Sequence, residues 1–180
     1  MVMIQELFLK ISLCCCVYRN LSIINLPYIP RGVRMRITIK TPKTRDDFKA
    51  YYDLRYRVLR EPWGQAKDTE KDDYEPISQH FMAVDEDKGK IVGVIKVFER
   101  SAGVGWVSHL AVDPAYQKKG IGKQLLAAVE QAARESGYTV LGCMSRLNTT
   151  LYFEKNGFFI AGIPNHYFGT TQVVWMEKKL

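Results

Sequence analysis

Two glycines and two lysines lie close together in the segment Gln117-Lys118-Lys119-Gly120-Ile121-Gly122. An apolar run at residues 107–112 precedes this segment, and a strongly helical run at residues 123–136 follows it. Glycines let backbone N–H groups approach an anion closely, and the N-terminus of a helix attracts negative charge. The order strand, loop, helix therefore predicts a site for a phosphorylated ligand. The residues alone indicate a diphosphate of unspecified identity.

Candidate bases for proton transfer are scattered along the chain. Glu75, His80 and His166 have suitable side chains, but each of these residue types is more common in structural or exposed positions. His109 lies on the strand before the loop, between Ser108 and the glycine segment. Strand alternation predicts that it faces the side of the sheet opposite to Ser108, where we expect a hydrogen-bonded structural histidine.

The elements that position the loop alternate between helical and extended patterns. Strands are predicted at residues 36–40, 77–85, 90–99, 107–112, 138–145, 158–163 and 172–178. Helices are predicted from a cap at Thr44 to the break at Pro62, at residues 123–136, and from a cap at Asn148 to Lys155, with an irregular segment at 164–170. This order predicts an α+β fold, an α/β/α arrangement with one mixed sheet and helices on both faces.

The first 34 residues differ from the rest of the 180-residue chain. Their apolar run at residues 11–18, which includes three consecutive cysteines, is too short to span a bilayer. We expect residues 1–34 to be a poorly ordered or dispensable extension and residues 35–180 to form the functional domain. That length suffices for one domain with a sizeable core.

Charge and cysteine content limit the function classes. The formal net charge is +7, yet no basic stripe with interleaved aromatic residues appears, so a solvated surface and an anionic cofactor explain the excess better than nucleic-acid binding. No Cys/His spacing typical of a metal site occurs, and Cys143 is expected to be a buried, inert thiol. We therefore expect a reduced, cytoplasmic protein with no metal, nucleic-acid or membrane partner.

An acidic stretch between the first helix and the second strand offers a hint about the substrate. A solvated loop is the ordinary interpretation of such a run. The alternative is an acidic rim that attracts a cationic amine. The residues concerned are Asp68, Glu70, Asp72, Asp73 and Glu75.

The glycine segment matches the Q/R-x-x-G-x-G/A signature of the GCN5-related N-acetyltransferase (GNAT) superfamily. The preceding Leu110-Ala111-Val112-Asp113-Pro114 and the later Phe153-Glu154-Lys155-Asn156-Gly157-Phe158 also resemble that family, in the same order and spacing. The resemblance covers residues 35–180. It implies a GNAT acyl-CoA N-acyltransferase fold with a splayed central sheet, and transfer of an acetyl group from acetyl-CoA to a primary amine of a small molecule or protein.

The resemblance also implies how the cofactor binds. Backbone N–H groups of residues 117–122 would hold the pyrophosphate, the pantetheine arm would pair with the strand edge at Leu110 and Val112, and Asn148 would reach the pantetheine end. A homodimer is left open. The implied cofactor-binding residues are Leu110, Ala111, Val112, Gln117, Lys118, Lys119, Gly120, Ile121, Gly122, Lys123 and Asn148.

The implied chemistry departs from the family at two places. The family often uses a tyrosine as proton donor at the position of Phe153, whereas this chain has its tyrosine one residue earlier, at Tyr152. Several members carry a basic side chain where this chain has Trp106 and Ser108. The candidate catalytic residues are Tyr152, Ser108, His80 and Glu75. The alternative is a degenerate member that binds an acyl-CoA as a sensor or interaction module without turnover.

Overall fold

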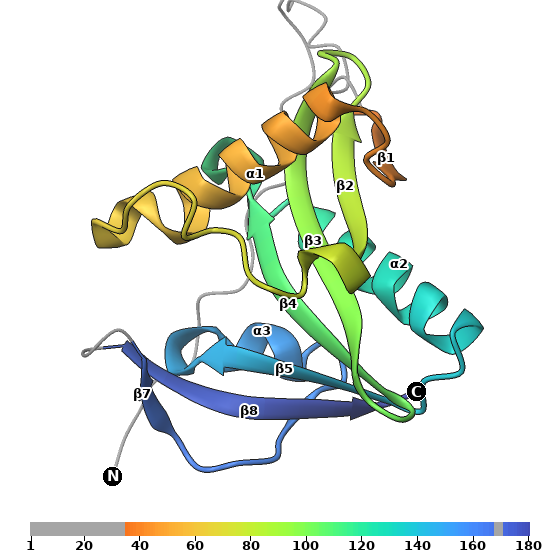
Figure 1. Ribbon diagram of the computed structural model, residues 1–180, viewed down its shortest axis with the longest axis vertical. Coiled ribbons are helices and arrows are strands. Elements are labelled where there is room, and N and C mark those ends of the chain that lie inside the picture. The colour runs from red at the N-terminus through yellow and green to blue at the C-terminus, as the bar shows by residue number, and fades with distance from the viewer. Residues whose placement is uncertain (1–34, 168–170) are drawn as a thin grey trace, which may run out of the picture. The chain divides into compact units, whose positions relative to one another are not determined.

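The computed structural model describes residues 35–167 and 171–180, which form one mixed sheet with helices on both faces (Figure 1). The strand order is β1-β2-β3-β4-β5-β8-β6, and β7 pairs with β8. This arrangement confirms the predicted α+β fold; the expectation for residues 1–34 lies outside the described residues. The strands are β1 (Ile37–Lys40), β2 (Gln79–Asp85), β3 (Lys90–Ser101), β4 (Val104–Val112), β5 (Val140–Arg146), β6 (Phe159–Ile160), β7 (Asn165–Tyr167) and β8 (Thr171–Lys179).

Helix α1 (Arg45–Leu59) covers one face of the sheet. Thr44 caps it as predicted, because its side chain accepts from the Asp47 N–H while the Asp47 carboxylate accepts from the Thr44 N–H. Tyr51 and Leu54 are fully buried against strands β2, β3 and β4. This face of the sheet also carries the connection between α1 and β2.

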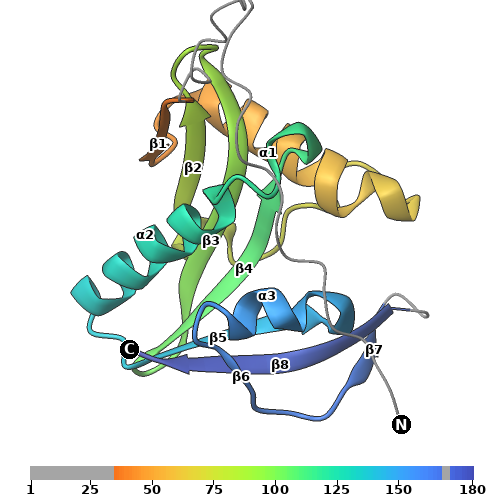
Figure 2. The same cartoon turned by 180° about the vertical axis from the view of Figure 1, so that it is seen from behind.

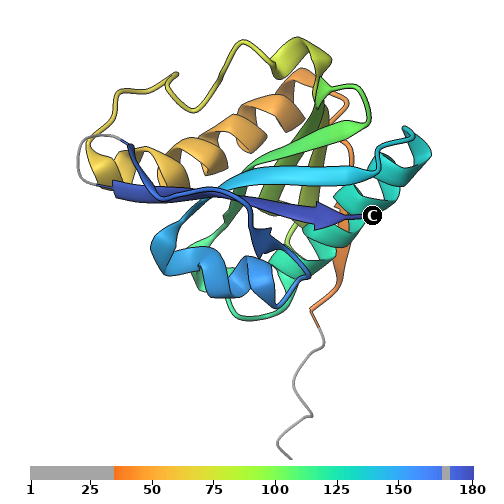
Figure 3. The ribbon, with the colours of Figure 1, turned by 90° about the horizontal axis from the view of Figure 1, so that it is seen from below.

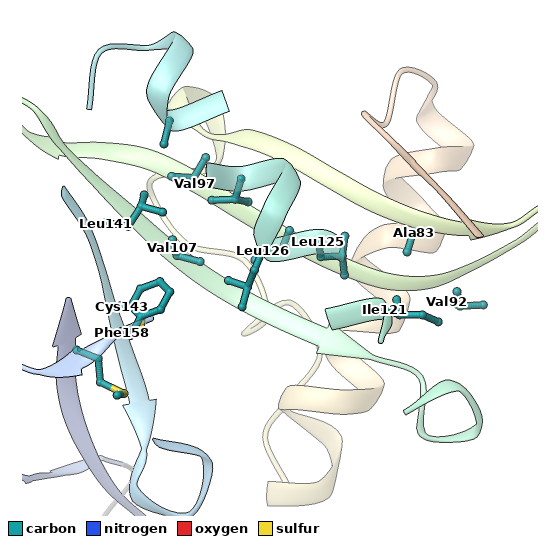
Figure 4. Close-up of a cluster of buried hydrophobic side chains, with 14 of the residues drawn as sticks. Ala83, Val92, Val97, Val107, Ile121, Leu125, Leu126, Leu141, Cys143 and Phe158 are labelled. Carbon is teal, nitrogen blue, oxygen red and sulfur yellow. The ribbon is translucent and has the colours of Figure 1, made fainter. Parts of the chain in front are cut away.

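Helix α2 (Ile121–Glu135) covers the opposite face, as the view from behind shows (Figure 2). Its apolar positions Leu125, Leu126 and Val129 are buried against side chains of the central strands, Val107 and Leu141 among them (Figure 4). Amphipathic spacing of this kind is what allowed the helix to be predicted from the sequence. The packing fixes the N-terminus of α2 beside the end of β4.

Strands β4 and β5 run parallel but pair over only part of their lengths. Their partners run from Val104 opposite Val140 to Val107 opposite Cys143, after which the two strands diverge (Figure 1). Beyond that point β5 continues to Arg146 and pairs with β8. The predicted splay of the sheet is therefore confirmed, and it leaves the β5-facing edge of residues 108–112 without a strand partner.

A bulge in β4 changes the direction of one side chain at the splay. Val94 pairs with Ala111 and Lys96 with Ser108, so Ile95 alone lies opposite two β4 residues, His109 and Leu110. His109 adopts a left-handed backbone conformation, with φ of 55°. Its ring lies against the Ser108 hydroxyl, so the prediction that these two side chains face opposite sides of the sheet is wrong. Alternation fails because a bulge inserts an extra residue into one strand.

The third helix and the last strands depart from their predicted bounds. Residues Leu147–Thr149 form a 3₁₀ turn, and α3 (Thr150–Glu154) follows it, so Asn148 does not cap this helix. The segment predicted to be irregular contains the short strand β7. No helix among the described residues is long and apolar enough to cross a membrane.

Candidate active site

A cavity of about 470 Å³ opens where β4 and β5 diverge. Helices α1 and α3 lie on opposite faces of the sheet (Figure 3), and residues from both sides line this cavity. On the α3 side are Thr149, Tyr152 and Phe153, and on the α1 side are Arg60 and Trp63. The cavity lies at the carboxyl ends of two parallel strands, which is where open α/β sheets bind ligands.

The glycine loop leads from β4 into α2 close to this gap. Gly120 is the N-cap of α2, with φ of 81°, and no side chain caps the helix. Its first N–H groups therefore have no side-chain acceptor, as an anion-binding helix terminus requires. Gln117 donates to the Val112 carbonyl at 3.1 Å, and Lys119 donates to the Ala115 carbonyl at 2.9 Å, which ties the loop to the end of β4.

Gly122 is required by a close approach rather than by its backbone angles. A Cβ atom at this position would lie 2.5 Å from the Tyr152 hydroxyl oxygen. The phenol of Tyr152 therefore reaches from α3 to the first turn of α2, on the α3 side of the cavity. Burial raises the pKa of Tyr152 to about 12, so the hydroxyl keeps its proton at neutral pH.

Ser108 and His109 lie together in the cavity wall on the α1 side. His109 Nδ1 is 3.2 Å from the Ser108 hydroxyl and 3.7 Å from the Asp72 carboxylate, and its Nε2 is 3.3 Å from Arg60 Nη2. Burial, reinforced by the charges of Arg55, Lys96 and Arg60, lowers the pKa of His109 to about 2. The imidazole is therefore neutral at physiological pH and a weak base.

A buried ion-pair network anchors the α1–β2 connection to the sheet beneath this wall. Arg55 and Lys96 have no exposed surface, and both bind Glu75, at 2.6 and 2.8 Å. Lys96 also pairs with Asp72. Burial raises the pKa of Glu75, but the hydrogen bonds from Arg55 and Lys96 outweigh it and lower this pKa to about 2. Glu75 is thus ionised, and its carboxylate is bound by two cationic side chains.

The same network explains a cluster with metal-ligand residue types. Asp72, Glu75 and His109 each offer one possible ligand atom, and these three atoms lie within 4.8 Å of one another. Both carboxylates already accept bonds from Lys96, and a metal ion beside this buried ammonium and the Arg55 guanidinium would meet strong repulsion. The three side chains do not fit a metal site.

The structure places the remaining candidate residues at different distances from the cavity. Ser108 and Tyr152 line it, whereas His80 and Glu75 do not. His80 is buried against the rings of Phe48 and Tyr51, and burial lowers its pKa. Among the implied cofactor-binding residues, Leu110 lines the cavity. Asn148 is exposed in the turn before α3, and its neighbour Thr149 lines the cavity.

Arg146 and Trp63 are among the lining residues that sequence reasoning missed. Arg146 ends β5, and its guanidinium carbon lies 4.5 Å from the ring centre of Trp63, which follows α1. The pair joins segments that are far apart in the chain, so spacing could not reveal it. The available signal was the position of Arg146 directly after an apolar strand, because sites form at the carboxyl ends of parallel strands.

Comparison with known proteins bears on this geometry. The family model described as the acetyltransferase (GNAT) family matches residues 48–158. A Lactobacillus plantarum protein has a similar solved structure, with 23% identity, a TM-score of 0.72, and coverage of 80% of this chain and 98% of that one. An acyl-CoA N-acyltransferase from Pseudomonas aeruginosa has 19% identity, a TM-score of 0.69, and coverage of 80% and 99%.

A third similar structure was solved with a ligand. It is an aminoglycoside 6'-N-acetyltransferase complexed with coenzyme A, with 17% identity, a TM-score of 0.67, and coverage of 81% of this chain and 97% of that one. At such identities the likeness establishes the shared fold, including the open sheet.

Proposed function

The chain belongs to the acetyltransferase (GNAT) family, and we propose that it transfers an acetyl group from acetyl-CoA to a primary amine of a small molecule or peptide. The observation that carries the proposal is the gap between β4 and β5, whose cavity is lined from both faces of the sheet. Such a gap lets a donor approach from the α3 side and an acceptor from the α1 side.

The donor subsite is formed by the loop and the free edge of β4. We assign the pyrophosphate of acetyl-CoA to the backbone N–H groups of residues 117–122, supported by the uncapped start of α2. The edge at Leu110 and Val112, which has no strand partner on the β5 side, suits the amide groups of a pantetheine arm, which would add to it as a strand does. Asn148 and Lys123 flank this path in our assignment. The residues present therefore fit the cofactor.

The chemistry needs few groups from the protein. A backbone N–H at Leu110 or Val112 would stabilise the developing oxyanion, a contribution of about 2.7–4 kcal/mol for donors of this kind. Tyr152, protonated at neutral pH, would donate a proton to the leaving thiolate. Ser108 lies on the acceptor side and would orient the amine. We assign Glu75 and His80 to the frame behind the cavity, because neither lines it.

A second candidate function is an acyl-CoA sensor without turnover. The observation that favours it is Phe153, which lines the cavity where the family often has its proton-donating tyrosine. His109, which lines the same cavity from the α1 side, is neutral and weakly basic, and this also favours a protein without turnover.

A thiol-release screen separates the two. Acetyl-CoA would be incubated with the protein and with polyamines, aminoglycosides, amino acids or peptides, while free thiol and coenzyme A affinity are measured. Acetyl transfer predicts amine-dependent thiol release with at least one class. Tight coenzyme A binding without such release in any class would support the sensor instead.

A further inference from the structure

The charged lining of the cavity is not balanced. Among the described residues that line it, the charged side chains are Arg60, Arg146 and Asp72, and the imidazole of His109 is neutral. The lining of the described cavity therefore has a formal charge of +1. The acidic loop suggested a cationic acceptor, but three of its five carboxylates are paired within the protein: Asp68 with Lys71, and Asp72 and Glu75 with Lys96. Of the five, Asp72 alone lines the cavity.

Arg146 contributes the positive charge of the lining that has no matching negative charge. It lies on β5, with its guanidinium over the Trp63 ring, and among the described residues it pairs with no carboxylate. Burial, and then the charge of Arg60, lower the pKa of Arg146. A partly buried cation next to a like charge is costly unless an anion compensates it.

Arg60 is held in position beside it. Its Nε donates to the Thr69 carbonyl at 2.8 Å and its Nη2 lies 3.3 Å from His109. Asp72, the carboxylate of the lining, is engaged by the fully buried Lys96. Among the described residues, no carboxylate therefore pairs with Arg146, and Asp72 in the same lining is already bound by Lys96.

We infer that Arg146, with Arg60 beside it, binds a carboxylate carried by the acceptor, so that the acceptor is an amine with its own carboxylate, such as an amino acid. This inference rests on the proposed acetyl transfer and names the class of its acceptor. A guanidinium stacked on an indole keeps its edge N–H groups available, and their fork matches the two oxygens of a carboxylate. The lining charge of +1 is balanced by one such group. A polyamine or aminoglycoside would instead bring positive charge against two guanidinium groups.

The test uses reaction products, because they bind without needing turnover. N-acetylated amino acids and the corresponding amides would be titrated into the full chain at saturating coenzyme A, and their Kd values measured by calorimetry. The two ligands of each pair differ in the carboxylate alone. We expect at least one acid to bind about tenfold or more tightly than its amide, as one charge-assisted hydrogen-bonded contact provides. Arg146→Gln should reduce that ratio to about one.

Arg100→Gln is the matched control. The Arg100 guanidinium also stacks on indoles, 4.1 Å from the Trp106 ring centre and 4.7 Å from that of Trp175, but Arg100 does not line the cavity. This variant should keep the preference for the acid. Coenzyme A affinity and the thermal midpoint of each variant report whether it is folded.

Equal Kd values for acid and amide in the wild type, or a preference for the acid that survives Arg146→Gln, would overturn the inference, as would failure of every acid to bind. If any of these outcomes is found together with acetyl transfer to amines that lack a carboxylate, the inference fails but the proposed function still holds. Conversely, a preference for the acid that is lost in Arg146→Gln, together with no thiol release from any amine, supports the carboxylate site and rejects acetyl transfer.

Discussion

His109 shows how a single backbone angle decides the character of a site. Its left-handed conformation turns the ring into the cavity beside Ser108, in surroundings that lower its pKa to about 2. The pKa values of Tyr152 and Cys143, both raised by burial to about 12, lie far above neutrality. None of these three lining residues changes its charge between pH 6 and pH 9.

The pH dependence of transfer should therefore follow the acceptor. Attack requires a neutral amine, so kcat/KM should rise with pH to the pKa of that amine, near about 8 for an α-amino group and above about 10 for a lysine-type amine. His109→Asn, which tolerates the left-handed conformation, should change the rate but leave the midpoint of this rise unchanged. If kcat/KM of the wild type instead rose near pH 6.5, and His109→Asn lost that rise, His109 would be the base. That result would contradict the account.

The contact between Gly122 and Tyr152 gives a second test at single residues. Gly122→Ala places a methyl group against the phenol oxygen and should destabilise the protein by about 1–3 kcal/mol, the usual cost of overpacking. In a Tyr152→Phe background the nearest atom is the ring carbon, 3.3 Å from the added Cβ, so the cost should be much smaller. Urea unfolding of the two single variants and the double variant measures this coupling. Additive effects would show that the side chains do not meet.

At the scale of elements, the α1–β2 connection depends on buried ion pairs. Glu75→Gln leaves two cations with no exposed surface, Arg55 and Lys96, without their shared charged partner. Removing one member of a buried pair costs about 3–5 kcal/mol, and we expect a loss of this size in the free energy of unfolding. Asp53→Asn, which breaks the exposed pair with Arg57, should cost less than about 1 kcal/mol and serves as the control. Equal losses would mean that the network does not hold the loop.

The network also predicts a dependence of stability on pH. The pKa of Glu75 is lowered in the folded protein from its ordinary value of 4.5 to about 2. Its contribution is therefore fully present above pH 4.5 and is lost as the pH falls through 2. Between these values the free energy of unfolding should fall more steeply in the wild type than in Glu75→Gln. Parallel slopes in urea unfolding across this range would contradict the assigned ion pairs.

Local patterns predicted most of these elements, and long-range pairing explains what they could not predict. The capping box at Thr44 and the amphipathic spacing of Leu125, Leu126 and Val129 are local signals, and the helices that they predicted are confirmed. The position of the loop at residues 117–122 between a strand and a helix was also predicted, because its glycines and its flanking elements lie within a few residues; its role in holding the donor stays a prediction. The bulge at His109 depends on how β3 pairs with β4, which strand alternation does not contain. Arg146 meets Trp63 only through the folded sheet.

At the scale of the whole molecule, the described residues that line the cavity, and the glycine loop, lie between Leu59 and Val173. The first 34 residues supply net +3 of the formal charge but none of those positions. Deleting them should therefore leave coenzyme A affinity and the thermal midpoint of residues 35–180 unchanged, as calorimetry of both chains would show. Loss of folding or of cofactor binding would make this segment part of the functional domain.

The central claim is that the loop and the free edge of β4 hold the donor. Backbone hydrogen exchange, measured residue by residue with and without coenzyme A, tests it most directly, because the proposed contacts are made by N–H groups. The account predicts slower exchange at Leu110 and Val112 and in residues 117–123 on binding, with little change at the β1–β2 edge. Binding that slows exchange elsewhere and leaves these amides unchanged would contradict it.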